Sequence, residues 1–204
     1  DYYAKQAWKK PVAVLVDRGS ASASEIFAGA IQDYKRGLVI GHRTFGKGTV
    51  QALDTLSSGQ IKITESKFYR VTGESTQNKG VTPDIELPSS WDIETSGESS
   101  LYLSLPWDTI PPVRYRTFDI DEDILAAVKK SHLNRLNESP NMKYILNLRE
   151  RYDLVKNKKE LSLNIDNRKK EKAERKDWIF DIENTRRENV GLTRFETYSD
   201  MEDF

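Results

Sequence analysis

The sequence contains no cysteine, only two histidines and no long apolar run. The lack of cysteine excludes disulfide bonds, thiolate nucleophiles and thiolate metal ligands. His42 and His132 lie far apart and outside any spacing typical of a zinc site, so we expect neither a metal nor another cofactor. No stretch approaches the ~20 apolar residues that span a bilayer, and no signal peptide is recognisable. The chain runs quickly from Asp1 into a predicted strand, and we expect it to be part of a longer protein.

Charge is abundant but balanced, with 32 basic and 32 acidic residues, and charged residues make up 31% of the chain. A neutral total gives no general attraction to nucleic acid, so we expect no nucleic-acid partner. The high charged fraction predicts a large exposed helical surface. A chain of 204 residues can hold one sizeable domain or two small ones.

The first part of the sequence has the pattern of an α/β fold. A continuous apolar run at residues 11–17 is typical of a strand that is buried on both faces. A helix and a second apolar strand follow, and this order predicts a parallel βαβ unit. The full set of predicted elements is a helix at residues 22–36 and strands at residues 11–17, 38–41, 49–56, 60–71 and 85–87.

The second part of the sequence is helical. Residues 88–112 are polar and rich in proline, which predicts an ordered excursion or a linker. Helical spacing of apolar residues begins at Asp121, and residues 166–188 are dense in Lys, Arg and Glu. Their mixed signs favour a solvated face over a nucleic-acid stripe. We place the first domain at residues 1–116 and a mainly helical domain at residues 117–204.

The segment from Gly19 to Glu25 is a turn of small residues between the first strand and the helix. Ser22 lies where backbone N–H groups point outward and the helix dipole favours negative charge, which suits a nucleophile. The alternative is a helix cap, since Ser22 and Glu25, three residues later, fit a capping box. One turn can serve both functions.

Lys47 lies between Gly46 and Gly48, after an apolar strand. Burial lowers the pKa of a lysine, and a neutral amine can act as a general base toward a hydroxyl group. The alternatives are a surface lysine and a phosphate-binding loop. The phosphate-binding pattern fails because Gly48 stands where a hydroxyl residue is required.

Two further residues are candidates for supporting this pair. Gln51 lies four positions after Lys47, so an extended segment places both side chains on one face, where the glutamine carbonyl can accept from the amine. Asp33 lies eleven residues after Ser22, on nearly the same helix face but ~16 Å along the axis. We therefore expect Asp33 to have a supporting role, pairing with Arg43 or another group of the loop before Lys47, rather than bonding Ser22.

Three segments together closely resemble the carboxyl-terminal processing peptidases, and among these the periplasmic tail-specific proteases: residues 20–26, 45–51 and 77–84. The resemblance implies a partial crotonase/Clp-like ββα protease core followed by a mainly α-helical C-terminal domain. It implies that Ser22 is the nucleophile and Lys47 its base, with Gln51 and Asp33 among the functional residues. The N–H of Ala23 would supply one donor to the oxyanion.

The same resemblance implies the activity and the partners. It predicts a serine endopeptidase that degrades or processes proteins from apolar C-terminal tails through an acyl-enzyme, in the periplasm, with an adaptor lipoprotein as a partner. The family's PDZ domain and the Gly-rich segment that supplies a second oxyanion donor are absent from this sequence. Losing one such donor costs about 10²–10³ in turnover, so we expect the isolated chain to be poorly active. The alternatives are a non-catalytic interaction fragment and a crotonase-type acyl-CoA enzyme.

Overall fold

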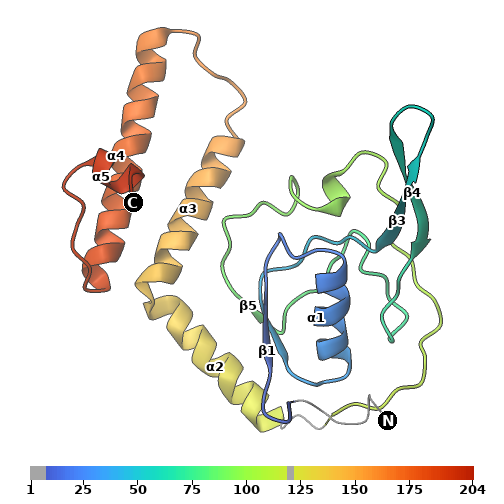
Figure 1. Ribbon diagram of the computed structural model, residues 1–204. Helices are drawn as coiled ribbons and strands as arrows, with labels where there is room; N and C mark the ends of the chain where they lie inside the picture. Colours follow the sequence, from blue (N-terminus) through green and yellow to red (C-terminus); the bar gives the residue numbers. More distant parts are fainter. Residues whose placement is uncertain (1–7, 119–121) are drawn as a thin grey trace. The chain divides into compact units, whose positions relative to one another are not determined.

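The computed structural model describes residues 8–118 and 122–204 (Figure 1). The chain forms two compact units. The first combines Asp1–Leu87 with Trp91–Lys129, and the second combines Pro88–Ser90 with Lys130–Phe204. Helix α2 (Glu122–Glu138) runs from the first unit into the second. The domain boundary that we placed between residues 116 and 117 stays a prediction.

The first unit contains a three-stranded parallel sheet with the order β1-β2-β5. Its strands are β1 (Ala13–Val16), β2 (Leu38–Gly41) and β5 (Ile85–Glu86). Helix α1 (Ala23–Asp33) connects β1 to β2, which pair in parallel with Val14 opposite Val39. The predicted parallel βαβ unit is therefore confirmed.

Helix α1 packs against one face of this sheet. The buried core consists of Val16, Ala28, Val39 and Val81, with Val14 packed against it. Side chains alternate between the two faces of a strand, so Leu15 points away from this core, and it is 76% exposed. The expectation that the first strand is buried on both faces is wrong for the described chain, because α1 covers only the face that carries Val14 and Val16.

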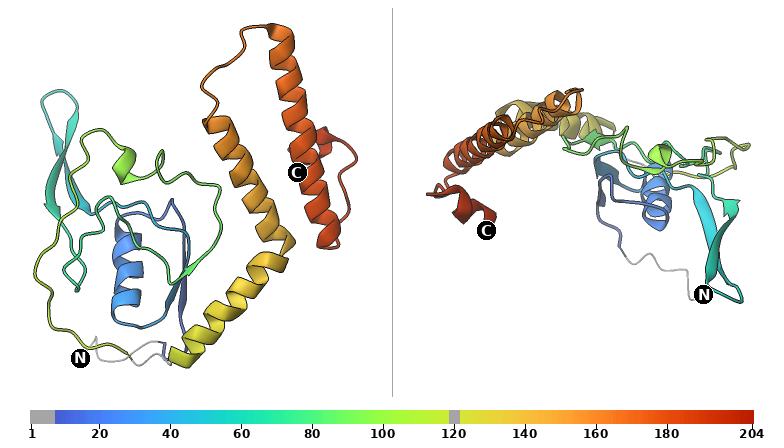
Figure 2. Two further views of the ribbon diagram at one scale, coloured as in Figure 1. Left: turned by 180° about the vertical axis from the view of Figure 1, so that it is seen from behind. Right: turned by 90° about the horizontal axis from the view of Figure 1, so that it is seen from above.

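A β-hairpin follows directly after Lys47. It consists of β3 (Thr49–Thr55) and β4 (Gln60–Lys67), which pair antiparallel. Gly59 takes a φ of 84° in the turn between them, in a region that favours glycine. The hairpin projects away from the three-stranded sheet, as both views in Figure 2 show. Lys47 therefore lies where the chain passes from the sheet into the hairpin.

The polar, proline-rich segment after β5 is ordered. Residues 92–108, which we call the strap, lie against the loops of the first unit and contain the short helix η1 (Glu98–Ser100). The backbone N–H of Glu98 donates to the carbonyl of Phe45 at 3.0 Å, and the indole N–H of Trp107 donates to the carbonyl of Ser75 at 2.8 Å. We predicted either an ordered excursion or a linker for residues 88–112, and the strap is an ordered excursion.

The second unit is helical. It contains α3 (Pro140–Lys156), α4 (Ile165–Asn189) and α5 (Tyr198–Glu202), and α3 and α4 run antiparallel (Figure 1). The Asn184 side chain is fully buried and bonds both the N–H and the carbonyl of Phe195, which fixes the segment between α4 and α5. Within the described ranges, no helix is both long enough and apolar enough to cross a bilayer.

Candidate active site

Ser22 occupies a strained turn between β1 and α1. It is the N-cap residue of α1, with φ 55° and ψ −113°. A non-glycine residue in such a backbone conformation costs about 1–3 kcal/mol, and residues of this kind cluster at active sites. The next residue, Ala23, is the first of α1, and the N–H groups of a first helical turn have no acceptor within the helix. The turn thus presents a hydroxyl group beside an outward-facing backbone donor.

Glu25 joins this serine turn to the loop that carries Lys47. Its side chain is fully buried. One carboxylate oxygen, Oε2, accepts from the backbone N–H of Ser22 at 2.9 Å and from the backbone N–H of Lys47 at 2.8 Å. The other oxygen, Oε1, accepts from the N–H of Gly46 at 2.7 Å and from the Thr44 hydroxyl. A single carboxylate therefore holds the backbones of both candidate catalytic residues.

The electrostatics of Glu25 reflect two opposed effects. Burial raises the pKa of its carboxyl above the ordinary value, because the charged form loses its hydration. The hydrogen bonds from Thr44 and from the N–H groups of Gly46, Ser22 and Lys47 act to lower the pKa. Burial has the larger effect.

The loop around Lys47 requires glycine at both flanks, for two different reasons. Gly46 has a φ of 94°, which an L side chain rarely adopts. Gly48 lies against the chain at Gln77, and a Cβ atom at Gly48 would lie only 2.6 Å from the Gln77 nitrogen. The contact is held by a hydrogen bond of 2.8 Å from the N–H of Gly48 to the Gln77 side-chain oxygen. The loop is thus fitted closely to residues 77 and 78.

The Lys47 amine has two oxygen acceptors. It donates to Gln51 Oε1 at 2.9 Å and to Thr49 Oγ1 at 3.1 Å. The hydrogen bond to Gln51 is the one predicted from the four-residue spacing, and it is confirmed. Thr49 was not predicted to take part. A neutral amine has two N–H bonds and one lone pair, so these two acceptors would leave the lone pair available to accept a proton.

Asp33 lies at the other end of α1, away from Ser22. Arg70 forms a bidentate ion pair with Asp33, with Arg70 Nε at 2.9 Å from Asp33 Oδ2 and Arg70 Nη2 bonded to Oδ1. The expected pairing with Arg43 is wrong, because the Arg43 guanidinium donates instead to the carbonyls of Lys79 and Asn78. Helical geometry gave the position of Asp33 but not which of several arginines reaches it. Asp33 therefore ties α1 to the segment after β4.

Several buried polar residues around the site were not predicted to take part. These are Arg18, Thr44 and Gln77, together with the long-range contacts of Glu25. Glu25 lies in the segment 20–26 that carries the family resemblance, but the only role that the sequence suggested for it was the capping box. Its side chain does bond the N–H of Ser22 as that motif requires. Among the residues that the structure describes, no group of His, Cys, Asp and Glu side chains is suited to hold a metal ion.

Two family models match adjoining parts of the chain. Residues 1–87 match peptidase family S41, and residues 91–203 match the C-terminal domain of tail specific protease. These matches confirm the predicted fold class, part of an α/β protease core followed by a mainly helical C-terminal domain.

Two curated relatives agree with the family matches. The tail-specific protease of Haemophilus influenzae is 42% identical over 149 residues, which are 67% of this chain and 21% of that protein. A probable CtpA-like serine protease of Staphylococcus epidermidis is 46% identical over 84 residues, covering 41% of this chain and 17% of that protein. Among solved structures, the photosystem II D1 C-terminal processing protease is 47% identical, with a TM-score of 0.36, and the match covers 38% of this chain and 20% of that one.

The chain spans about a fifth of the length of these relatives. The match to the C-terminal domain nevertheless extends over more than half of the chain itself. The chain belongs to the tail-specific protease family, with residues 1–87 in peptidase family S41 and residues 91–203 in the family's C-terminal domain.

Proposed function

We propose that this chain carries the nucleophile and the general base of a serine peptidase, with Ser22 as the nucleophile and Lys47 as the base. The observation that carries the proposal is the shared contact to Glu25. One oxygen of that carboxylate lies 2.9 Å from the Ser22 nitrogen and 2.8 Å from the Lys47 nitrogen, so the two nitrogens can be no further apart than these distances together. The backbones of two residues far apart in sequence are thereby held close together, which supports the assignment of both to one site.

The proposed reaction is acyl transfer from a peptide to the Ser22 hydroxyl. The Lys47 amine takes the proton of the Ser22 hydroxyl, and the oxygen attacks the carbonyl carbon of the scissile peptide bond. The N–H of Ala23 donates to the oxyanion that forms. The C–N bond then breaks, and the Lys47 ammonium gives its proton to the leaving amine. Water enters, is deprotonated by the same amine and releases the acyl group.

The surroundings of Lys47 support its assignment as the base. The amine donates to Gln51 and Thr49, and in the neutral form that a base requires these two acceptors would take both N–H bonds and leave the lone pair open. Glu25 accepts from the backbone N–H of Lys47 and so fixes where the side chain begins. Asp33 has a positioning role, because its ion pair with Arg70 secures the far end of the helix that begins after Ser22.

The resemblance extends the proposal to substrates, location and partners. We propose that the full-length protein cleaves proteins that end in apolar C-terminal tails, in the periplasm. Its partners would be those protein substrates, a PDZ domain in the parent chain and an adaptor lipoprotein. Support comes from the match to the C-terminal domain of tail specific protease over residues 91–203.

The test uses the full-length gene product and a reporter protein with an apolar C-terminal tail. Ser22→Ala and Lys47→Ala should each abolish cleavage while leaving the melting temperature close to that of the unaltered protein. Lys62→Ala, at an exposed position of β4, is the matched control and should remain fully active. Full cleavage by the Ser22→Ala protein would reject the mechanism.

A further inference from the structure

The strap matches the C-terminal domain in sequence but packs with the first unit in the structure. Residues 91–203 match the C-terminal domain of tail specific protease. The structure nevertheless groups residues 91–129 with the sheet and α1, in the first unit. A segment of the C-terminal domain is therefore built into the unit that carries Ser22 and Lys47.

The strap lies beside both loops of the candidate site. The Phe45 carbonyl accepts from the N–H of Glu98 at 3.0 Å, while the N–H of Phe45 donates to the Ser20 carbonyl at 2.9 Å. Phe45 thus joins the strap to the serine turn, two residues before Lys47. Arg18 is only 1% exposed, and its guanidinium donates to the carbonyls of Ser96 in the strap and Thr44 before the lysine loop.

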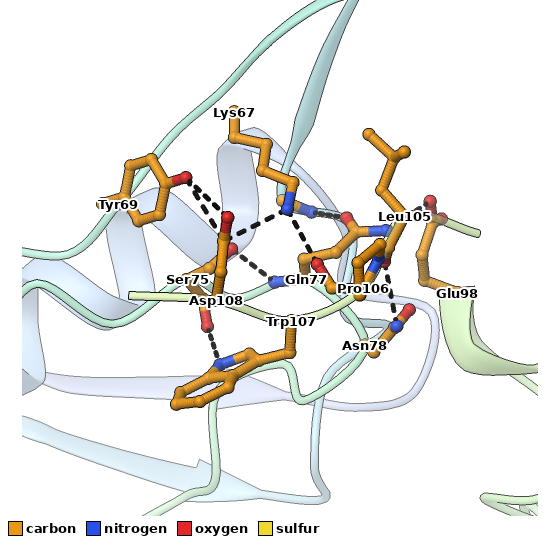
Figure 3. A network of polar contacts seen from close by, with 11 residues as sticks. Lys67, Tyr69, Ser75, Gln77, Asn78, Glu98, Leu105, Pro106, Trp107 and Asp108 are labelled. Carbon is orange, nitrogen blue, oxygen red and sulfur yellow. Dashed lines mark hydrogen bonds and ion pairs between the residues drawn. The ribbon is translucent and has the colours of Figure 1, made fainter. Parts of the chain in front are cut away.

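A buried side-chain relay connects the strap to the residue after Lys47. The N–H of Gly48 donates to Gln77 Oε1 at 2.8 Å, and Gln77 Nε2 donates in turn to Glu98 Oε1 at 3.2 Å. Gln77 is fully buried and Glu98 is 8% exposed. Figure 3 shows Glu98 and Gln77 within the network of polar contacts around the strap.

The strap also holds the segment that contains Gln77 from its other side. The Asn78 side-chain amide donates to the carbonyl of Leu105 at 3.0 Å, and the Trp107 indole donates to the carbonyl of Ser75 at 2.8 Å (Figure 3). The N–H of Asn78 then donates to the carbonyl of Gly46 at 2.8 Å. Residues 75–78 are therefore held between the strap and the Lys47 loop.

We propose that Glu98, a strap residue, is a positioning residue of the peptidase that acts through Gln77 on the Gly48 backbone and so on Lys47. This inference rests on the proposed function of Ser22 and Lys47. Glu98 does not touch the reacting atoms. It determines how the glutamine side chain between the strap and the loop is oriented.

The physical reason is the asymmetry of a glutamine amide. One end of the group accepts hydrogen bonds and the other end donates them, so the amide can be built in two orientations of similar shape. The N–H of Gly48 needs the oxygen end. The Glu98 carboxylate accepts only from the nitrogen end, which selects that orientation. Without Glu98, the buried NH₂ group of Gln77 loses its acceptor in the strap, and the N–H of Gly48 alone holds the amide. The glutamine side chain can then shift to find another acceptor, which weakens the contact to Gly48 and loosens the loop around Lys47.

The test is a swap of the two side chains in the full-length protein, with kcat and KM measured on the tailed reporter well below the melting temperature. Gln77→Glu places two carboxylates against each other and should lower kcat at least tenfold, with KM little changed. Glu98→Ala should lower kcat similarly. Glu98→Gln retains an oxygen that accepts from Gln77, so it should keep most of the activity.

The double variant Gln77→Glu/Glu98→Gln is the decisive measurement. It reverses which side chain is charged, yet it keeps an oxygen for the N–H of Gly48 and a donor between the two side chains. Activity should therefore return to within about threefold of the unaltered protein, because every donor again has an acceptor. A double variant as impaired as Gln77→Glu alone would overturn the proposal, as would an unchanged kcat in Glu98→Ala.

Asn184→Ala supplies a matched control for stability. It removes a buried side chain that forms two hydrogen bonds, but in the second unit. It should lower the melting temperature without lowering kcat. Failure of the proposed function would look different, since Ser22→Ala would then cleave the reporter as fast as the unaltered protein does.

Discussion

Replacing Glu25 with glutamine tests whether one carboxylate organises the site. Glutamine has the same shape but only one accepting oxygen, whereas Glu25 accepts from four donors. The least costly arrangement keeps the glutamine oxygen on the N–H groups of Ser22 and Lys47. Its NH₂ group then faces the N–H of Gly46 and the Thr44 hydroxyl, which already accepts from the N–H of Val81. Both the N–H of Gly46 and the proton of the Thr44 hydroxyl lose their acceptor.

The magnitude follows from these contacts. Each buried donor without an acceptor costs about 1–3 kcal/mol. The other contacts change from charged to neutral, and hydrogen bonds to charged groups contribute about 1.5–3 kcal/mol against about 0.5–1.5 for neutral ones. Removing a desolvated charge offsets part of this loss, because burial of Glu25 disfavours its ionised form. We expect a net loss of about 2–4 kcal/mol in the free energy of unfolding of the first unit.

The assay is urea unfolding together with reporter cleavage in the full-length protein. Glu25→Gln should lower kcat by about 10–100-fold at temperatures where the protein is folded, because the Ser22 and Lys47 backbones are no longer held by a charged group. Glu65→Gln, an exposed glutamate in β4, is the control and should change neither quantity. If Glu25→Gln kept the stability and the kcat of the unaltered protein, the idea of a single organising carboxylate would be refuted.

Three further predictions concern the same helix and its two ends. Ser22→Gly should abolish cleavage yet stabilise the first unit by about 1 kcal/mol, since glycine tolerates a φ of 55° at little cost; an unfolding curve at or below that of the unaltered protein would argue against strain. Asp33→Asn should lower the free energy of unfolding by about 2–3 kcal/mol and reduce kcat much less than Lys47→Ala does; an equal loss of kcat would assign Asp33 to the chemistry instead. A carbon-13 NMR titration should give Glu25 a pKa above the ordinary 4.5, and a value at or below 4.5 would contradict this. A raised pKa means that the folded chain binds this proton more tightly than the unfolded chain does. The contribution of Glu25 to stability therefore declines as the pH rises from about 4.5 through the raised pKa.

The elements of the first unit could be predicted from sequence because their signals are local. The strand, helix and strand at the start of the chain each have a distinct periodicity, and the structure contains all three. The bond between Lys47 and Gln51 was predictable for the same reason, since an even spacing in an extended segment places two side chains on one face. Burial of Leu15 was predicted wrongly, because an apolar run does not reveal how many layers cover a sheet.

The contacts that assemble the site leave no comparable local signal. The capping box gave Glu25 a sufficient local explanation, so nothing in the pattern pointed to Gly46 or Lys47, more than twenty residues later. The relay from Gly48 through Gln77 to Glu98 joins three segments whose spacing follows no helix or strand period. Loops that meet without forming a sheet have no ladder of backbone hydrogen bonds, so their buried backbone groups depend on isolated backbone bonds and on long-range side-chain bonds such as these.

This shortage of backbone pairing explains why buried polar side chains gather around the Lys47 loop. Glu25 accepts from the N–H of Lys47 and Gln77 accepts from the N–H of Gly48, so two neighbouring peptide groups depend on two different side chains. If either contact is lost, the loop around Lys47 can shift, because its glycines make the backbone flexible. That shift strains the contact that remains. The effects on kcat of losing the Glu25 contact and of losing the Gln77 contact should therefore not add. We propose that the strap takes part in this coupling through Glu98, so that a segment matching the C-terminal domain helps to hold the candidate site.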